Sequence, residues 1–260
     1  MSLRLVSLAS GSKGNSALIY SDNTAILCDA GVSYTRISKA LKGLGFNLCD
    51  VSGIVVTHEH SDHICAVKKL CDFIPIYAHP LTAKAIYDRQ GMLKNYKSVD
   101  FYENGFEIGD IKVLPFRIPH DAEYPLGYTF ECGKDRVSIA TDMGFATNGV
   151  YQNIKDSQVV LLESNHDVEM LTNGPYTPAL KKRILSKSGH LSNDMAAVMA
   201  ERLAVGKTHT LVLGHLSEQN NAPGLALDTV KARVDKLGSG MRVTVALQNE
   251  ISEVFKTDEK

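Results

Sequence analysis

Three histidines and an aspartate lie close together in residues 57–63 of this 260-residue chain, which read Thr-His-Glu-His-Ser-Asp-His. Imidazole and carboxylate groups are ligands for zinc, manganese and iron, and His58 and His60 point the same way if the segment is extended. Asp62 and His63 then face a second point. The spacing therefore predicts two adjacent metal ions. Two ions about 3.5–4 Å apart are a recurring device for hydrolysing phosphate esters.

The residues around this segment predict how its ligands are positioned. The apolar run at residues 53–57 indicates a buried strand that ends at the histidines, which argues against a solvated loop. Three more residues of ligand type, His120, Asp142 and His215, each follow an apolar strand-like run. A single polar residue at a strand end is usually a turn former or a cap. Together with the histidine segment, however, the three form a consistent set of further ligands.

A second group of residues could act on the substrate of such a site. Glu163 ends a predicted strand, and His190 precedes a predicted helix N-terminus, where backbone donors favour a phosphate. A departing alkoxide must be protonated, and a histidine oriented by a carboxylate can do this. We therefore pair His190 with Glu163 as a candidate acid, and expect Asp62 to orient an attacking hydroxide that bridges the two ions.

Four residues are candidates for substrate binding. Residues 10–16 read Ser-Gly-Ser-Lys-Gly-Asn-Ser, a glycine-rich turn that could offer backbone N–H groups and a lysine to an anion, or could be a plain hairpin turn. The segment lacks the spacing of a nucleotide-binding P-loop. Within it, Ser12, Lys13 and Asn15 are the expected substrate contacts. His166, just after a predicted strand, is the fourth.

Composition restricts the class of protein. Hydrophobic residues make up 44% of the chain and charged residues 22%, and no apolar run is long enough to cross a membrane. The N-terminus lacks the pattern of a signal peptide, so we expect a cytoplasmic protein. The five cysteines are scattered, which predicts reduced thiols in the core, including Cys65 on a helix expected at residues 62–70. The sequence carries no signal of oligomeric state.

The net charge of −1 gives no global attraction to nucleic acid, so a polyanion would have to meet a local basic patch. Residues 181–183, Lys-Lys-Arg, are the best candidate, although a solvated helix face is the favoured interpretation. Tyr124 and Tyr176 could stack on a base, but we favour simple packing.

The order of predicted elements favours an α/β protein. No Pro/Gly/Ser-rich linker divides them, so residues 1–260 are expected to form one domain made of two halves. An αββα sandwich, with two mixed sheets and helices on the outer faces, accommodates many strands and few surface helices. Strands are predicted at residues 3–9, 16–21, 24–29, 53–57, 74–78, 106–108, 111–113, 127–131, 137–141, 159–163, 210–213 and 242–247, and helices at 34–44, 62–70, 81–89, 193–203 and 225–237.

The set of polar residues resembles the metallo-β-lactamase superfamily along nearly the whole chain. That resemblance implies two divalent ions, with Zn²⁺ favoured over Mn²⁺ or Fe²⁺. It implies that Asp29 supports the site without binding a metal. The implied ligands are His58, His60 and His120 for one ion, Asp62, His63 and His215 for the other, and Asp142 as the bridge.

Three segments, at residues 162–166, 189–193 and 214–221, are similar to the YycJ (WalJ, VicX) family within that superfamily. They are more distantly similar to the phosphodiesterase branch that includes tRNase Z. The YycJ resemblance implies a nuclease that acts on DNA as a 5′-to-3′ exonuclease. The chain has no long inserted arm and no large insertion between Asp142 and His215, which argues against tRNA processing and against the large RNase machines.

Two alternatives stay open. The same site could serve a small-molecule cyclic phosphodiesterase, or a thioester or lactone hydrolase. A basic groove would favour nucleic acid, whereas a closed apolar pocket would favour an acyl substrate. A regulatory module with a structural metal is disfavoured, because a structural zinc normally needs only four ligands.

Overall fold

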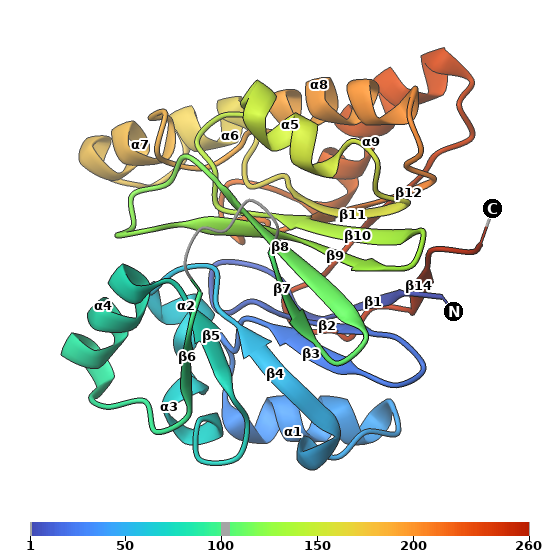
Figure 1. Cartoon of the computed structure of the whole chain (residues 1–260). Helices are drawn as coiled ribbons and strands as arrows, with labels where there is room; N and C mark the ends of the chain where they lie inside the picture. Colours follow the sequence, from blue (N-terminus) through green and yellow to red (C-terminus); the bar gives the residue numbers. More distant parts are fainter. Residues whose placement is uncertain (1, 100–104, 260) are drawn as a thin grey trace.

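Two stacked β-sheets form the centre of the protein, and helices cover the outer face of each sheet (Figure 1). The computed structural model describes residues 2–99 and 105–259, and within these residues each sheet has seven strands. Both sheets contain parallel and antiparallel neighbours. The predicted α/β class and the αββα sandwich of two mixed sheets are therefore confirmed.

The first sheet combines the N-terminal half of the chain with one strand from its C-terminal end. Its strands run in the order β14-β1-β2-β3-β4-β5-β6, antiparallel from β14 to β3 and parallel from β3 to β6. The carboxyl ends of β3 and β4 therefore share one edge, where Asp29 and residues 57–63 follow. The strands are β1 Arg4–Ala9, β2 Ser16–Tyr20, β3 Ala25–Cys28, β4 Val51–Val55, β5 Ile76–Ala78, β6 Tyr96–Ser98 and β14 Phe255–Lys256.

The second sheet runs in the order β13-β12-β11-β10-β9-β8-β7. Strands β7 to β10 are antiparallel neighbours, whereas β10 to β13 are parallel. Asp142, Glu163 and His215 lie at or just beyond the carboxyl ends of β10, β11 and β12, on one edge of the sheet. The strands are β7 Phe106–Ile108, β8 Ile111–Arg117, β9 Leu126–Cys132, β10 Asp135–Ala140, β11 Val159–Glu163, β12 Thr210–Gly214 and β13 Arg242–Val245.

Buried apolar side chains attach the helices to the two outer faces. Ile37 and Leu41 of α1 and Ile86 of α4 belong to the cluster on the first sheet. Leu203 of α8 and Val230 of α9 belong to the cluster on the second sheet. The helices are α1 Tyr34–Gly43, α2 Ser61–Ile64, α3 Val67–Leu70, α4 Pro80–Gln90, α5 Asn148–Ile154, α6 Val168–Asn173, α7 Pro178–Ile184, α8 Asn193–Ala204 and α9 Pro223–Val234.

A third apolar cluster lies between the two sheets. Ile26 and Val55 of the first sheet share it with Tyr128 and Phe130 of the second. The Tyr128 hydroxyl also donates a hydrogen bond of 2.8 Å to the backbone oxygen of Val56, at the end of β4. Because close-packed interiors resist sliding, this layer holds the ligand-bearing edges of the two sheets against each other.

The single helix predicted at residues 62–70 is wrong, because two short helices, α2 and α3, take its place. Between them the main chain bonds to another segment: the N–H of Ala30 donates to the oxygen of His63, and the N–H of Ala66 donates to the oxygen of Ala30. These bonds replace the helical ladder. Cys65 lies at the break and is exposed, so the expectation that it faces the core is also wrong.

The remaining cysteines divide between core and surface. Cys28, Cys71 and Cys132 are buried as expected, whereas Cys49 is exposed, so its predicted core position is wrong. All five cysteines are free thiols.

Five short elements, β6, β14, α5, α6 and α7, were not predicted from the sequence. Strand β14 has only two residues, and α7 begins at a proline and is rich in lysine and arginine, so neither shows a clear apolar period. Within residues 2–99 and 105–259, no helix is both long and apolar enough to cross a bilayer.

Candidate metal centre

Three of the residues at the sheet edges adopt a backbone conformation that side chains rarely tolerate. Asp29, Asp142 and His215 have φ angles of 61°, 60° and 55°, in the left-handed region. Each directly or closely follows a strand, and aspartate and histidine are among the residues enriched in this conformation. Strain of this kind persists where the surrounding structure fixes it, and it gathers at functional sites. The turn at each strand end aims the side chain into the space between the sheets' edges.

Three imidazoles converge on a first point. Nδ1 of His60 lies 3.1 Å from Nε2 of His58 and 3.2 Å from Nε2 of His120. Burial is the largest cause that lowers the pKa of all three side chains, so they are neutral and can present lone pairs. Three facing nitrogens cannot all be satisfied by hydrogen bonds among themselves. They suit a metal ion, for which neutral imidazole is a preferred ligand.

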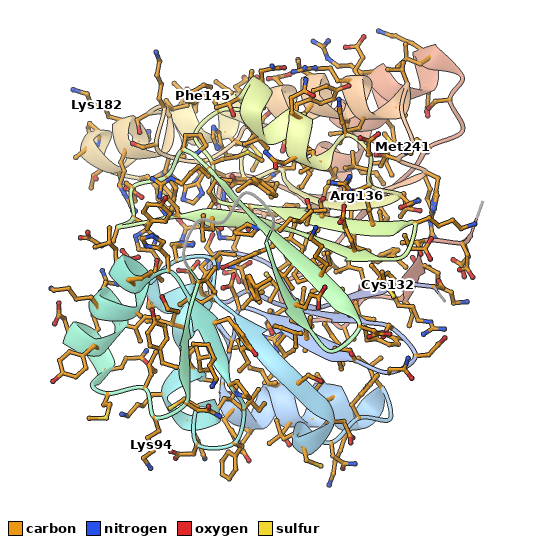
Figure 2. The ribbon with its side chains drawn as sticks, in the orientation of Figure 1. Lys94, Cys132, Arg136, Phe145, Lys182 and Met241 are labelled. Carbon is orange, nitrogen blue, oxygen red and sulfur yellow. The ribbon has the colours of Figure 1, made fainter. Side chains whose placement is uncertain are left out.

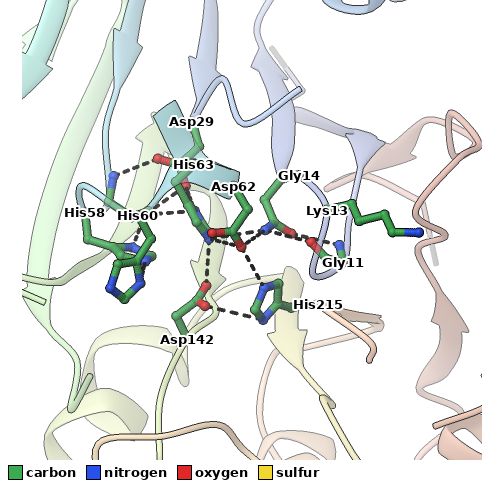
Figure 3. A network of polar contacts seen from close by, with 12 residues as sticks. Gly11, Lys13, Gly14, Asp29, His58, His60, Asp62, His63, Asp142 and His215 are labelled. Atoms are coloured by element: carbon green, nitrogen blue, oxygen red, sulfur yellow. Dashed lines mark hydrogen bonds and ion pairs between the residues drawn. The ribbon is translucent and has the colours of Figure 1, made fainter. Parts of the chain in front are cut away.

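A second group lies beside the first. Oδ2 of Asp62 is 3.5 Å from Nε2 of His63 and 3.4 Å from Nε2 of His215, and the four side chains Asp62, His63, Asp142 and His215 meet in Figure 3. Burial alone would raise the pKa of Asp62, but His63 and His215 hold it well below its ordinary value. Burial alone would lower the pKa of His215, but Asp142, Asp62 and Glu163 raise it to about 10.

Asp142 lies between the two groups. Its Oδ2 is 3.2 Å from Nε2 of His63, and its Oδ1 is 3.4 Å from Nδ1 of His215 and 3.9 Å from Nε2 of His120. The Oδ2 atom is buried and has no hydrogen-bond partner among the described residues. A buried carboxylate oxygen without a donor is costly unless a cation meets it. The donor set therefore fits two divalent ions with Asp142 between them.

Asp29 supports this arrangement from behind. Its Oδ2 accepts a hydrogen bond of 2.8 Å from Nδ1 of His63, and its Oδ1 accepts one of 2.8 Å from the backbone N–H of Thr57. On the opposite side, Nδ1 of His120 lies 3.1 Å from the backbone oxygen of Gly189. Such partners fix the tautomer of a ligand histidine and the direction of its free nitrogen.

Asn15 lies against two of the expected ligands, and its side chain does not line the cavity in front of them. Its side chain is buried, and its Nδ2 lies 3.3 Å from Oδ2 of Asp62 and 3.1 Å from Nε2 of His63. Its Oδ1 accepts a hydrogen bond of 2.9 Å from the N–H of Gly11, which ties the loop to the side chain. These contacts favour a positioning role for Asn15 over the substrate contact that the sequence predicts.

The other two predicted substrate contacts in the glycine-rich loop, Ser12 and Lys13, lie in different places. Ser12 lines the cavity in front of the metal centre. Lys13 points away from the ligands in Figure 3, and its Nζ lies 2.6 Å from a carboxylate oxygen of Glu218. The N–H of Lys13 donates to Oε1 of Gln248, so this donor is already used inside the protein. The structure therefore brings Ser12 to the site but leaves Lys13 outside it.

Glu163 and His190 are in direct contact, although 27 residues separate them along the chain. Nδ1 of His190 lies 2.7 Å from Oε1 of Glu163, and Nδ1 of His215 lies 3.0 Å from the same oxygen. Burial alone would raise the pKa of Glu163, but His190 and His215 hold it below its ordinary value. Glu163 is thus an ionised, buried carboxylate that orients two imidazoles at the edge of the centre.

His166 lies behind this pair, away from the solvent. It is 1% exposed, and neither of its ring nitrogens has a hydrogen-bond partner among the described residues. Burial lowers its pKa to about 4, so the ring is neutral at ordinary pH. It does not line the cavity in front of the metal centre, so the structure does not bring it to the position expected for a substrate contact.

A cavity of about 330 Å³ opens in front of the metal centre. His60, Asp62, Asp142, His190 and His215 line it, together with Tyr176 and Arg183, which the sequence had noted, and with residues that it had not singled out. Tyr124 is elsewhere: its ring stacks on His79 with centroids 3.4 Å apart, which matches the favoured packing role. The added lining residues are Ser61, Arg89, Asn165, Tyr176, Leu180, Arg183, Ile184 and Ser217.

Two of these lining residues are arginines. Arg183 belongs to the basic run at residues 181–183, which the sequence offered as the best candidate for a basic patch although a solvated helix face was favoured. Arg89 carries no comparable signal, because nothing in its surrounding sequence links the helix α4 to the metal segment.

Comparisons with known proteins agree with this site. Residues 9–215 match the metallo-β-lactamase superfamily. The exodeoxyribonuclease YycJ of Bacillus anthracis is 35% identical over 263 positions, which cover 100% of this chain and 97% of that protein. The exodeoxyribonuclease WalJ of Streptococcus pneumoniae serotype 2 is 34% identical over 241 positions, with 91% and 90% covered.

The fold itself is shared with solved structures of low sequence identity. The metallo-β-lactamase fold protein YhfI from Bacillus subtilis superposes with a TM-score of 0.75 at 14% identity, over 98% of this chain and 100% of that chain. The geometry is that of a metal-dependent hydrolase. The chain belongs to the metallo-β-lactamase superfamily and, within it, to the family of the exodeoxyribonucleases YycJ and WalJ.

Proposed function

We propose that this protein is a dinuclear metal-dependent exonuclease that degrades DNA from a 5′ end. The observation that carries the proposal is the position of His190, which lines an open cavity at the edge of the double cluster of ligands and is held from behind by the buried Glu163. The YycJ and WalJ relatives, named as exodeoxyribonucleases, support DNA as the substrate.

The ligand assignment follows the two convergence points. His58, His60 and His120 would hold one ion, and Asp142 would reach both. Asp62, His63 and His215 would hold the other. We favour Zn²⁺, with Mn²⁺ and Fe²⁺ also compatible with nitrogen and carboxylate donors. When bound, the ions supply a water of lowered pKa and neutralise charge on the phosphate.

Two side chains have separate roles in the proposed reaction, one toward the attacking water and one toward the departing oxygen. Asp62, 23% exposed and facing the cavity, is placed to orient the attacking water. His190 is 16% exposed at its side chain and also faces the cavity, so it can deliver a proton to the departing oxygen. Glu163 holds Nδ1 of His190, which leaves Nε2 as the nitrogen that donates.

The lining of the cavity argues for a phosphate substrate over an acyl substrate. Arg89 and Arg183 lie on its walls, whereas a thioester or lactone would be favoured by a closed apolar pocket. The five free thiols support a reducing, cytoplasmic compartment. A small phosphodiester is the second candidate, since the ligand geometry alone serves both.

The test is degradation of end-labelled DNA and RNA, single-stranded and double-stranded, by metal-free protein resupplied with zinc or manganese. An Asp142→Ala variant serves as the control. Shortening of DNA from the 5′ end, dependent on metal and absent in the variant, is the expected result. If no polymer is cut while bis-p-nitrophenyl phosphate is hydrolysed, the exonuclease proposal is wrong and the small phosphodiester takes its place.

A further inference from the structure

Two arginines face the same cavity from opposite sides of the sandwich. Arg89 lies near the end of α4, which covers the first sheet, and Arg183 lies near the end of α7, on the side of the second sheet. Figure 1 shows α4 and α7 at the same end of the molecule, below and above the ligand-bearing edges of the sheets. A group bound at the metal centre would therefore have a guanidinium on each side.

Arg183 is held in place with donors to spare. Its Nε lies 2.5 Å from Oδ2 of Asp121, and its Nη2 lies 3.1 Å from Oδ1 of the same carboxylate. This fork uses two of the five N–H donors of the guanidinium, and the others stay available. Asp121 is the main cause that raises the pKa of Arg183, and Asp62 adds to it, so the guanidinium is within electrostatic reach of the ligands.

Arg89 is anchored to the ligand segment itself. Its Nη1 donates a hydrogen bond of 2.9 Å to the backbone oxygen of Glu59, which lies between the ligands His58 and His60. Among residues 2–99 and 105–259, Arg89 forms no ion pair, so no carboxylate of that part of the chain neutralises its charge. A phosphate in the cavity would supply the missing anion.

An apolar wall continues from Arg183. Tyr176, Leu180 and Ile184 line the cavity next to it, and the tyrosine ring is half-buried. An aromatic and aliphatic surface beside a cationic one suits a nucleotide, whose base stacks on the former while its phosphate meets the latter. A cavity of about 330 Å³ is at the small end of ligand sites, which favours one unpaired nucleotide over a duplex.

We propose that Arg89 and Arg183 form a phosphate clamp that holds the non-reacting phosphates of an unpaired nucleic-acid strand end on either side of the metal centre. The inference rests on the proposed nuclease function and adds the residues that recognise the strand. Planar guanidinium groups suit this task because they meet two phosphate oxygens at once, which a lysine cannot do.

The test compares a polymer with a diester that has no neighbouring phosphate. The activity of Arg89→Ala, Arg183→Ala and Arg183→Lys is measured on a single-stranded oligodeoxynucleotide and on bis-p-nitrophenyl phosphate, with metal content checked for each variant. We expect each variant to lose kcat/KM on the oligonucleotide by roughly tenfold or more beyond its loss on the small diester. The logarithm of kcat/KM should also fall less steeply with the logarithm of salt, by about 0.7 per lost phosphate contact.

Matched controls lie on the same two helices. Lys182 of α7 points away from the body of the protein in Figure 2, and Lys84 of α4 is paired with Asp88 at the surface. Neither lines the cavity, so Lys182→Ala and Lys84→Ala should keep the wild-type salt dependence and the wild-type ratio of the two activities.

The possible results distinguish failure of the phosphate-clamp proposal from failure of the proposed nuclease function. If the wild type shortens DNA but the arginine variants lose both activities equally, or behave like the lysine controls, the clamp is wrong and the nuclease stands. If the wild type cuts no polymer at all, the proposed function itself fails.

Discussion

Glu163 holds His190 with one carboxylate oxygen and is itself fixed by backbone N–H groups through the other. Oε1 lies 2.7 Å from Nδ1 of His190, and Oε2 accepts hydrogen bonds of 2.7 Å from the N–H of Met143 and 3.2 Å from that of Leu191. Nδ1 of His215 also meets Oε1, and His190 and His215 hold the pKa of Glu163 below its ordinary value. The side chain is therefore an ionised acceptor that contacts both imidazoles.

Removal of His190 should slow turnover and spare the metals. His190→Ala is expected to reduce kcat by about 10²- to 10⁴-fold, the usual contribution of a positioned acid, while metal content measured by elemental mass spectrometry stays at the wild-type level. Glu163→Gln should lower the free energy of unfolding more than His190→Ala does. In either orientation its amide NH₂ would face a donor, on the imidazole side or on the backbone side. Loss of metal from His190→Ala would contradict this division of roles.

Removal of a proposed ligand should abolish metal binding and activity together. His60→Ala takes one nitrogen from the three converging imidazoles, and Asp142→Ala takes the carboxylate that reaches both groups. Each variant should lose at least one bound ion by elemental analysis and all measurable hydrolysis. Cys65→Ser is the matched control, since this thiol is exposed just beyond His63 and should retain both ions. Full metal content in Asp142→Ala would refute its bridging position.

Asn15 should act on metal affinity. Asn15→Ala removes the amide that meets Asp62 and His63, and loss of such a supporting contact typically weakens metal binding about 10- to 100-fold. Titration with a chromophoric chelator would measure the change. Lys13→Ala, in the same loop but paired with Glu218 at the surface, should bind metal like the wild type. If Asn15→Ala binds metal as tightly as the wild type, the positioning role is wrong and the substrate-binding role that the sequence suggested is favoured.

Gly31 is required by the close approach of two chain segments. A Cβ at this position would lie 1.6 Å from the backbone oxygen of Asp62 and 2.7 Å from the backbone nitrogen of Asn15. Gly31→Ala should therefore displace the ligand segment, lower the thermal midpoint by several degrees and reduce metal content. Gly43→Ala at the end of α1 meets nothing within 4 Å and should be neutral or slightly stabilising. Equal midpoints for the two variants would contradict the predicted clash.

His166 should make the protein sensitive to mild acid. Burial lowers its pKa to about 4 from an ordinary 6.5. Between these two pH values the histidine is protonated in the unfolded chain but neutral in the folded protein. Its contribution is fully present above pH 6.5, is lost as the pH falls toward 4, and amounts to about 3 kcal/mol across that range. Urea unfolding of metal-free wild type and His166→Gln from pH 7 to 4 would measure the difference. If the two curves stay parallel, His166 does not titrate in this way.

The ligand segment could be identified from the sequence because its chemistry is local. His58, His60, Asp62 and His63 follow one apolar strand, and their spacing alone indicates a metal centre. The pairing of His190 with Glu163 was also within reach, since one ends a strand and the other precedes a helix. The αββα fold followed from the alternation of apolar runs and from the family resemblance.

Other features depended on contacts between distant parts of the chain. Lys13 turns from the site because Glu218 and Gln248, more than 200 residues away in sequence, bind the side chain and backbone of that loop. Cys65 is exposed because Ala30 breaks the expected helix. Arg89 reaches the cavity because its guanidinium bonds to the backbone of Glu59, a residue 30 positions away in the sequence. Residue types and their local spacing determine which chemistry is available, whereas the partner that each group meets is chosen by the packing of the two sheets.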